Sequence, residues 1–386
     1  MPWPMLLLTL LPTLLFGACS DPPTAPDSER RLSLSETLGA EEDEGYARAL
    51  VPRPFVFPED HGPHPEFKTE WWYYTGNLRD GAGRRFGYQL TFFRVALSPQ
   101  SLDRPSEWGA NQIYMGHFAL SDIDGRQFFA AERFSRAALD LAGAQAAPFR
   151  VWLEDWQASG EDQTFPMRLQ AGDGQTTIDL SLSQGKPLVL QGEAGLSRKS
   201  AADGNASYYY SFTRLPTQGQ VRIDGQTFTV SGDSWLDREW STSALAPDQQ
   251  GWDWFALQLD DDHELMFYQL RLQDGGSDPA SKGIWVTPDG TGRLLRRDDV
   301  ELQVLKTWHS PRGGTYPAQW KLKVPGENLE LTVTPLLADQ ELDVSIRYWE
   351  GAVWVEGRRA GRKISGRGYV ELTGYAEDLS ETQKKR

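Results

Sequence analysis

Two carboxylates lie two residues apart in the segment SGDSWLDREWSTS, residues 231–243. If this segment is extended, alternate side chains share a face, so Asp237 and Glu239 lie together beside Trp235, while Arg238 and Trp240 face the other way. An apolar neighbour raises the pKa of a carboxyl group, which then keeps a proton for donation. The segment therefore predicts a catalytic acid at Asp237 or Glu239, with Trp235 and Trp240 at the substrate. The structural alternative is an Asp–Arg–Glu salt bridge at a domain junction.

A second group of candidates is aromatic. Trp252 and Trp254 share one face of a predicted strand, and Tyr268 lies on the strand expected to pair with it. Aromatic faces attract cations, so these side chains are predicted to bind a polyene or to stabilise a developing carbocation. The alternative is that they form barrel core.

Candidates also occur in the first half of the chain. Glu70 opens the aromatic run Trp71-Trp72-Tyr73-Tyr74 and is expected either to contact a ligand, together with Trp72 and Tyr74, or to pair with Arg94. We favour the pairing for Glu70. His117, in the apolar run QIYMGHFALSD, is a candidate catalyst, with a hydrogen-bonded core histidine as the commoner alternative.

Metal and cofactor signals are weak. His61 and His64 have a His-x-x-His spacing in a proline-rich loop, but the sequence offers no clear third and fourth ligands. No Gly-x-Ser-x-Gly elbow and no glycine-rich phosphate loop is present. We therefore predict neither a metal nor a cofactor.

These residues lie on strands that repeat. Residues 70–94 and 252–272 each begin with paired tryptophans and continue through an aromatic strand, an acidic turn and a strand containing Tyr-Gln-Leu. Seven Asp-Gly dipeptides mark turns, at positions 80, 124, 173, 203, 224, 274 and 289. The pattern predicts an all-β fold of two tandem antiparallel barrels, with a pair of sandwiches as the alternative. Residues 130–144 are the one candidate helix, and the polar segment 230–250 is expected to separate the halves.

Composition narrows the partners. The 386 residues carry a formal net charge of −15, which argues against nucleic acid, because phosphate binding needs a basic surface. The chain contains 15 Trp, and aromatic residues favour half-buried pleated surfaces. The predicted ligand is a hydrophobic small molecule or lipid.

The N-terminus predicts export. Residues 5–16 are apolar but too few to span a bilayer, and Gly17-Ala18 precede Cys19, the single cysteine. We predict a lipoprotein signal peptide cleaved before a lipidated Cys19 and an outer-membrane anchor facing the periplasm; an ordinary cleaved signal is the alternative. We predict five segments: a signal peptide (residues 1–18), an acidic tether (19–50), an N-terminal domain (51–240), a C-terminal domain (241–378) and a polar tail (379–386).

Four motifs carry a family resemblance. EWWYYTGNL, SWLDREWS, the GWDWFALQL–MFYQL hairpin and GRGYVELTGY, spread over residues 50–378, resemble the AttH/CrtC family of carotenoid 1,2-hydratases and predicted secreted hydrolases. The resemblance implies two lipocalin-like barrels, a large hydrophobic ligand and, in the hydratase branch, water addition to a terminal double bond. That branch has His-x-Trp and Tyr-x-Asp in its second half, where this chain has Trp252-Asp253-Trp254 and Tyr268-Gln269-Leu270.

Two functions follow from these observations. The favoured hypothesis is an envelope enzyme that acts on a hydrophobic substrate by acid catalysis, as a hydratase, hydrolase or isomerase. The alternative is a non-catalytic lipoprotein that binds a lipid or other hydrophobic ligand and works with an envelope ABC transporter.

Overall fold

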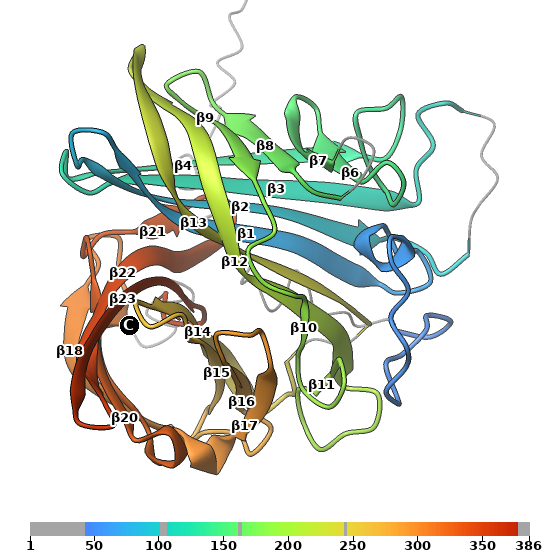
Figure 1. The fold of residues 1–386 in the computed structure, drawn as a ribbon. Helices are drawn as coiled ribbons and strands as arrows, with labels where there is room; N and C mark the ends of the chain where they lie inside the picture. Colours follow the sequence, from blue (N-terminus) through green and yellow to red (C-terminus); the bar gives the residue numbers. More distant parts are fainter. Residues whose placement is uncertain (1–42, 101–105, 161–163, 243–244, 377–386) are drawn as a thin grey trace, which may run out of the picture. The chain divides into compact units, whose positions relative to one another are not determined.

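The computed structural model describes residues 43–100, 106–160, 164–242 and 245–376. These residues form two antiparallel sheets (Figure 1), and their helical content is limited to three 3-10 turns, η1 Glu59–His61, η2 Arg297–Asp299 and η3 Pro325–Glu327. The predicted all-β class with two lipocalin-like units in tandem is confirmed. Among the described residues no helix is long and apolar enough to cross a membrane.

The first sheet has thirteen strands, in the order β4-β3-β2-β1-β13-β12-β9-β8-β7-β6-β5, with β10 and β11 also paired to β12. Its strands are β1 Thr69–Asp80, β2 Arg85–Ala96, β3 Gln112–Asp122, β4 Gln127–Arg136, β5 Ala142–Gln145, β6 Arg150–Leu153, β7 Trp156–Gly160, β8 Met167–Gly172, β9 Thr176–Leu182, β10 Val189–Leu190, β11 Leu196–Arg198, β12 Ala206–Ile223 and β13 Gln226–Ser241. The last strand, β13, pairs with the first, β1.

The second sheet has ten strands, in the order β17-β16-β15-β14-β23-β22-β20-β19-β18, with β21 paired to β22. Its strands are β14 Gln249–Leu259, β15 Glu264–Leu272, β16 Lys282–Val286, β17 Gly292–Arg296, β18 Glu301–His309, β19 Thr315–Val324, β20 Leu329–Pro335, β21 Glu341–Asp343, β22 Arg347–Arg359 and β23 Arg362–Leu372. Here too the last strand, β23, pairs with the first, β14.

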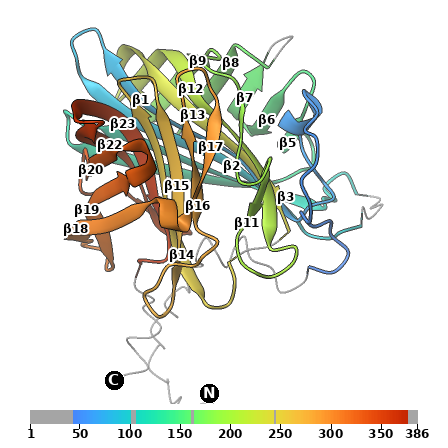
Figure 2. The ribbon, with the colours of Figure 1, turned by 60° about the horizontal axis from the view of Figure 1, so that its bottom comes forward.

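Alternation along the strands divides the apolar side chains between three kinds of core. One buried cluster fills the inside of the first sheet and a second fills the inside of the other. Two further clusters contain residues of both sheets, since β1 and β2 contact β23 and β22, and β12 contacts β14. Figures 1 and 2 show these strands side by side. The outer face of each sheet is therefore also buried where the two sheets meet.

Two details differ from the sequence-based expectation. The predicted helix at residues 130–144 is wrong: this stretch forms the end of β4 and the start of β5. The polar segment 230–250 is strand for its first half, because β13 continues to Ser241, and the break between the two sheets is confined to the residues between Ser241 and Gln249, where β14 begins. The turn of the hairpin between β12 and β13 is the dipeptide Asp224-Gly225, in which both residues have positive φ, as a two-residue type I′ turn requires.

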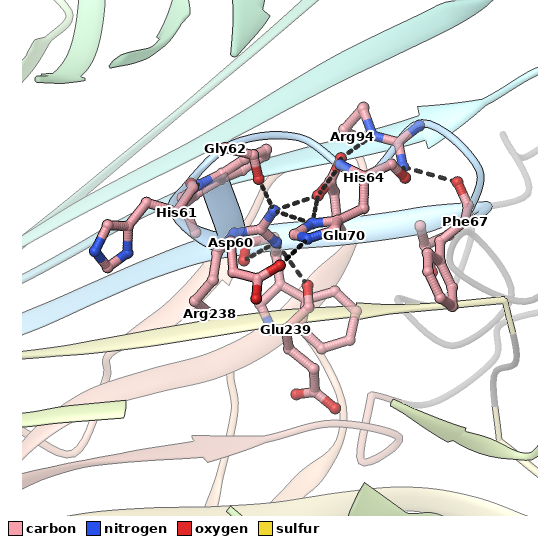
Figure 3. Close-up of polar contacts among 12 residues, drawn as sticks. Asp60, His61, Gly62, His64, Phe67, Glu70, Arg94, Arg238 and Glu239 are labelled. Atoms are coloured by element: carbon pink, nitrogen blue, oxygen red, sulfur yellow. Dashed lines mark hydrogen bonds and ion pairs between the residues drawn. The ribbon is translucent and has the colours of Figure 1, made fainter. Parts of the chain in front are cut away.

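A buried ion-paired cluster joins three neighbouring strands of the first sheet (Figure 3). The carboxylate of Glu70 on β1 accepts hydrogen bonds from Arg94 on β2 and Arg238 on β13, and all three side chains are fully buried. The backbone N–H of His64 also donates to both Glu70 oxygens, at 3.1 Å. Burial alone would raise the pKa of Glu70, but the two guanidinium groups outweigh burial and hold its pKa well below the usual range.

The guanidinium groups use their other donors on the segment that precedes β1. Arg94 donates to the carbonyl oxygens of His64 and Phe67, at 3.0 and 2.7 Å, and Arg238 donates to that of Gly62 at 2.5 Å. The cluster therefore fixes residues 62–67 against the strands as well as the strands against one another.

We predict that Glu70→Gln lowers the free energy of unfolding by about 3–5 kcal/mol at pH 7, because it leaves two buried guanidinium groups without their carboxylate. Since the folded-state pKa of Glu70 is lowered, its stabilisation is present above about pH 4.5 and is lost as the pH falls further. Urea denaturation at pH 7 and pH 3 should show a smaller difference between variant and wild type at the lower pH. The exposed Glu66, replaced by Gln, is the control, and a Glu70→Gln effect below about 1 kcal/mol would contradict the prediction.

Candidate functional site

A cavity of about 120 Å³ lies between the two sheets. A water molecule needs roughly 10–15 Å³ on the same measure, so the cavity has room for water beside an apolar group. Eight of its sixteen lining residues are aromatic and four are carboxylic acids, whereas Lys199 is the single cation among them. The cavity is thus aromatic-walled and crowded with carboxyl groups.

The first sheet supplies one wall through two cross-strand rows. The row nearer the start of β1 contains Phe93, Trp71, Glu239 and Tyr209. The next row contains Thr91, Tyr73, Asp237 and Ser211. All except Ser211 line the cavity. Each row takes one residue from each of β2, β1, β13 and β12, so the register of these four strands sets the wall.

The second sheet supplies the opposite wall. Its main row crosses β15, β14, β23 and β22 and contains Tyr268, Trp254, Glu371 and Glu350. Trp252 and Leu270, a neighbouring cross-strand pair, extend the wall, and Tyr348 completes it on β22. The hydroxyl of Tyr73 donates to Glu350 at 3.0 Å and the indole N–H of Trp254 donates to the Tyr209 hydroxyl at 3.3 Å, so hydrogen bonds connect the two walls.

Asp237 is buried at the centre of the first wall. Its carboxyl accepts hydrogen bonds from Ser211 at 2.5 Å, from the indole N–H of Trp235 at 2.6 Å and from the Tyr209 hydroxyl. Burial raises the pKa of Asp237 to about 7, and the nearby charge of Glu239 adds to the rise, although the three hydrogen bonds oppose it. At neutral pH a large fraction of Asp237 is therefore protonated inside an aromatic cavity.

Glu239 has a different environment, although it lies two residues away. Its carboxylate is 2.7 Å from the ammonium of Lys199 and accepts a hydrogen bond from Ser207. The same ammonium lies 4.5 Å from the centre of the Tyr268 ring. Glu239 and Lys199 thus form a charge-balanced pair at one side of the cavity.

Glu350 and Glu371 face each other as direct cross-strand partners on β22 and β23. Burial raises the pKa of Glu371 to about 7, and the charges of Asp237 and Glu239 contribute. Burial and then the charge of Glu371 raise the pKa of Glu350 well above its usual range. Two adjacent carboxyl groups in an aromatic cavity cannot both be ionised at low cost, so the pair holds a proton.

The structure brings five of the sequence-predicted site residues to this cavity: Asp237, Glu239, Trp252, Trp254 and Tyr268. Trp235 lies directly behind them as a donor to Asp237. The salt bridge proposed as an alternative among Asp237, Arg238 and Glu239 is absent, because Arg238 points to the opposite face and pairs with Glu70.

The other candidates lie away from the cavity. Trp72, Tyr74 and Trp240 belong to the core inside the first sheet, and Glu70 lies on the same face, in the ion-paired cluster. Trp72 and Tyr74 each lie one position along β1 from a lining residue, Trp71 or Tyr73, and a step of one position reverses the face in a strand. Trp240 likewise follows the lining residue Glu239 on β13. The sequence shows aromatic residues on both faces and therefore could not distinguish them.

The histidines are hydrogen-bonded structural residues. His117 is fully buried between Tyr348, at 2.8 Å, and Glu132, at 3.0 Å, and does not itself line the cavity. His61 bonds the Tyr210 hydroxyl at 2.6 Å, and His64 stacks on Trp240 with ring centres 3.8 Å apart. Within the described ranges no three His, Cys, Asp or Glu side chains are grouped to hold a metal.

Several lining residues are not among the candidates that the sequence suggests: Trp71, Tyr73, Lys199, Tyr209, Glu350 and Glu371. Glu350 and Glu371 each interrupt an apolar strand segment, in YWEGAV and YVELTG, and a lone carboxylate among such residues was the available signal. Lys199 carries no such signal, because it follows β11 in a polar loop. The predicted lipidation site Cys19 lies outside the described residues.

Comparisons with known proteins agree on the fold. The family model described as AttH-like matches residues 48–375. The crystal structure of an AttH protein from Nitrosomonas europaea is 36% identical, with a TM-score of 0.77, and the match covers 86% of this chain and 100% of that one. No curated protein matches the chain.

Two more distant structures share the architecture. Kievitone hydratase from Nectria haematococca is 15% identical with a TM-score of 0.64, and the match covers 86% of this chain and 97% of that one. The protein CghA is 13% identical with a TM-score of 0.50, over 87% of this chain and 98% of its own. At these identities the likeness concerns the fold.

We predict that Asp237→Asn stabilises the protein at pH 8. Because the folded-state pKa of Asp237 is raised from 3.8 to about 7, wild-type stability falls as the pH rises from about 4 to about 7, by at most roughly 4 kcal/mol. The amide removes this penalty, since its oxygen can accept from Trp235 and its N–H can donate to Tyr209.

Thermal melting should give a higher Tm for Asp237→Asn than for wild type at pH 8, with a difference that narrows toward pH 4. Asp233→Asn, on the same strand but outside the cavity, is the matched control. A lower Tm for Asp237→Asn at pH 8 would show that the ionised carboxylate, with its three donors, is the favoured form.

Proposed function

Because this chain belongs to the AttH-like family and has a proton-holding carboxyl group in an aromatic cavity, we propose that it is a hydratase-type enzyme. It adds water to a carbon–carbon double bond of a hydrophobic substrate by acid catalysis. The observation that carries the proposal is the buried Asp237, whose pKa of about 7 keeps a proton available at neutral pH. The catalytic pKa of a general acid works best near the operating pH.

The first step is proton transfer from Asp237 to the alkene, which leaves a carbocation and the Asp237 carboxylate. The donors that surround Asp237, from Ser211, Trp235 and Tyr209, stabilise the carboxylate as it forms. The ring faces of Trp252 and Trp254 attract the cation, and water then adds to it.

The choice of water as second reactant rests on the fold likeness to kievitone hydratase, whose name gives the reaction type. Lys199 neutralises Glu239, so this pair adds no net charge to the cavity when Asp237 loses its proton. The cavity has no unpaired cation among its lining residues, so a neutral substrate suits it better than an anionic one.

The location of the enzyme is also a proposal. The apolar run at residues 5–16 and the small residues before Cys19 support export and lipidation of Cys19. We propose that the protein is held at the outer membrane facing the periplasm, where substrate can come from lipid.

The second candidate function is a lipoprotein that binds a hydrophobic ligand without chemistry and works with an envelope ABC transporter. The eight aromatic side chains of the cavity favour this function, because they suit an apolar ligand whether or not an acid is present. Carboxyl groups of raised pKa are not needed for such a role, and for this reason we rank it second.

We predict that wild-type protein adds oxygen from H₂¹⁸O to citronellol, a neutral alcohol with one trisubstituted double bond, and that Asp237→Asn does so at least ~100-fold more slowly. The wild-type rate should fall as the pH rises above about 7, because the acid loses its proton. Mass spectrometry measures ¹⁸O in the product, and Asp233→Asn is the control. An undiminished rate in Asp237→Asn would exclude Asp237 as the acid.

A binding experiment combined with the ¹⁸O assay distinguishes the two candidate functions. Quenching of intrinsic tryptophan fluorescence by citronellol should be retained in Asp237→Asn if the protein is an enzyme or a carrier, whereas Trp254→Ala should weaken it by removing part of the wall. Retained binding in wild type without any ¹⁸O product favours the carrier.

A further inference from the structure

The Glu350–Glu371 pair has a geometry that the proposed function does not use. The two glutamates are cross-strand partners, so their side chains leave neighbouring strands on the same face and meet in the cavity. Both glutamates line the cavity, but Glu350 has no exposed surface, whereas Glu371 is partly exposed. Of the two, Glu371 is therefore the one that a molecule in the cavity can reach.

The hydrogen bonds of the pair are incomplete. Glu350 Oε2 accepts from the Tyr73 hydroxyl at 3.0 Å, and Glu371 Oε1 accepts from the indole N–H of Trp252 at 2.7 Å. No donor among the described residues bonds the buried Glu350 Oε1. The carboxyl groups contact each other, and such a contact is a hydrogen bond only when one of them is protonated. With the proton on Glu350, Glu371 is a carboxylate that still has a free lone pair.

The pair faces the catalytic acid across the cavity. Asp237 and Glu239 are on the first sheet and act electrostatically on Glu371, which is on the second. The titratable groups around the pair are Tyr73, Tyr348 and Tyr369 in addition to these carboxyl groups. Lys199 is held by Glu239. No cation therefore neutralises Glu371 from among the cavity-lining residues.

We propose that the Glu350–Glu371 pair is the general base of the reaction: Glu371 takes the proton of the attacking water while Glu350 holds the shared proton. This inference rests on the proposed function. It assigns the proton donor to one sheet and the proton acceptor to the other.

In the proposed reaction, the alkene π electrons form a C–H bond with the proton of Asp237, which leaves the neighbouring carbon cationic. A water oxygen forms the C–O bond with its lone pair, and one water O–H bond breaks, with the proton going to Glu371. Asp237 is then a carboxylate and the pair holds two protons. Transfer of one proton from Glu371 to Asp237 through water restores both groups.

The test separates alkene protonation from water addition, using citronellol in D₂O. Reversible protonation by Asp237 exchanges the vinyl hydrogen for deuterium, whereas hydration also needs the base. We expect Glu371→Gln to retain the exchange and to hydrate at least ~100-fold more slowly, Glu371→Asp to recover part of the hydration, and Asp237→Asn to lose both. Glu356→Gln, an exposed position on β22, should match wild type.

Three other outcomes would contradict the base role of Glu371. Hydration by Glu371→Gln at the wild-type rate overturns the base role and leaves the proposed function intact. Loss of both exchange and hydration in a Glu371→Gln protein that melts like wild type also overturns it, because Glu371 would then be needed for protonation. If wild-type protein neither exchanges nor hydrates citronellol, the proposed function fails and the inference fails with it.

The shared proton has a test that needs no substrate. Infrared difference spectra at pH 9 should show a protonated carboxyl band in wild type and Glu356→Gln, which Glu350→Gln removes. A spectrum of Glu350→Gln identical to that of wild type would show that Glu350 is ionised and would overturn the shared-proton arrangement.

Discussion

The ion-paired cluster of Glu70, Arg94 and Arg238 is the interaction on which the site depends. It lies inside the first sheet, fully buried, and joins the three adjacent strands β2, β1 and β13. Because side chains alternate along a strand, Arg238 facing inward means that Asp237 and Glu239 face outward. A shift of one residue in the pairing of β13 would separate Arg238 from Glu70 and would also remove the carboxyl groups of Asp237 and Glu239 from the cavity.

The cavity lies between the sheets and not inside either of them. In a lipocalin-like barrel the interior is the usual ligand site, but here both interiors are filled by large side chains, such as Trp156 and Trp240 in the first sheet and Trp320 and Trp349 in the second. The outer faces of β1, β2, β12 and β13 meet those of β14, β15, β22 and β23. An active site built in this way needs both sheets, since each supplies one wall and one pair of carboxyl groups.

Four carboxyl groups close together in one cavity repel one another when they are ionised, and only one of them is paired with a cation. Glu239 is balanced by Lys199, whereas Asp237 and the Glu350–Glu371 pair have no cation and respond by keeping protons. Groups that keep protons in an apolar site destabilise the fold at alkaline pH, and they are also the groups that can donate or share them. The same feature therefore links lower stability to acid–base chemistry.

The amino-acid sequence by itself determined the all-β class, the tandem repeat and the pairing of a Trp-rich strand with a Tyr-Gln-Leu strand, because these follow from local periodicity and turn residues. It also placed Asp237 and Glu239 on one face, since alternation in an extended segment is a local property. Tertiary structure alone decided that this face meets the second sheet, that Glu350 and Glu371 lie opposite, and that Trp71 and Tyr73 line the cavity while Trp72 and Tyr74 do not. These outcomes depend on strand pairing across more than a hundred residues and on which of two aromatic faces becomes the inside, and no local pattern in the chain encodes either.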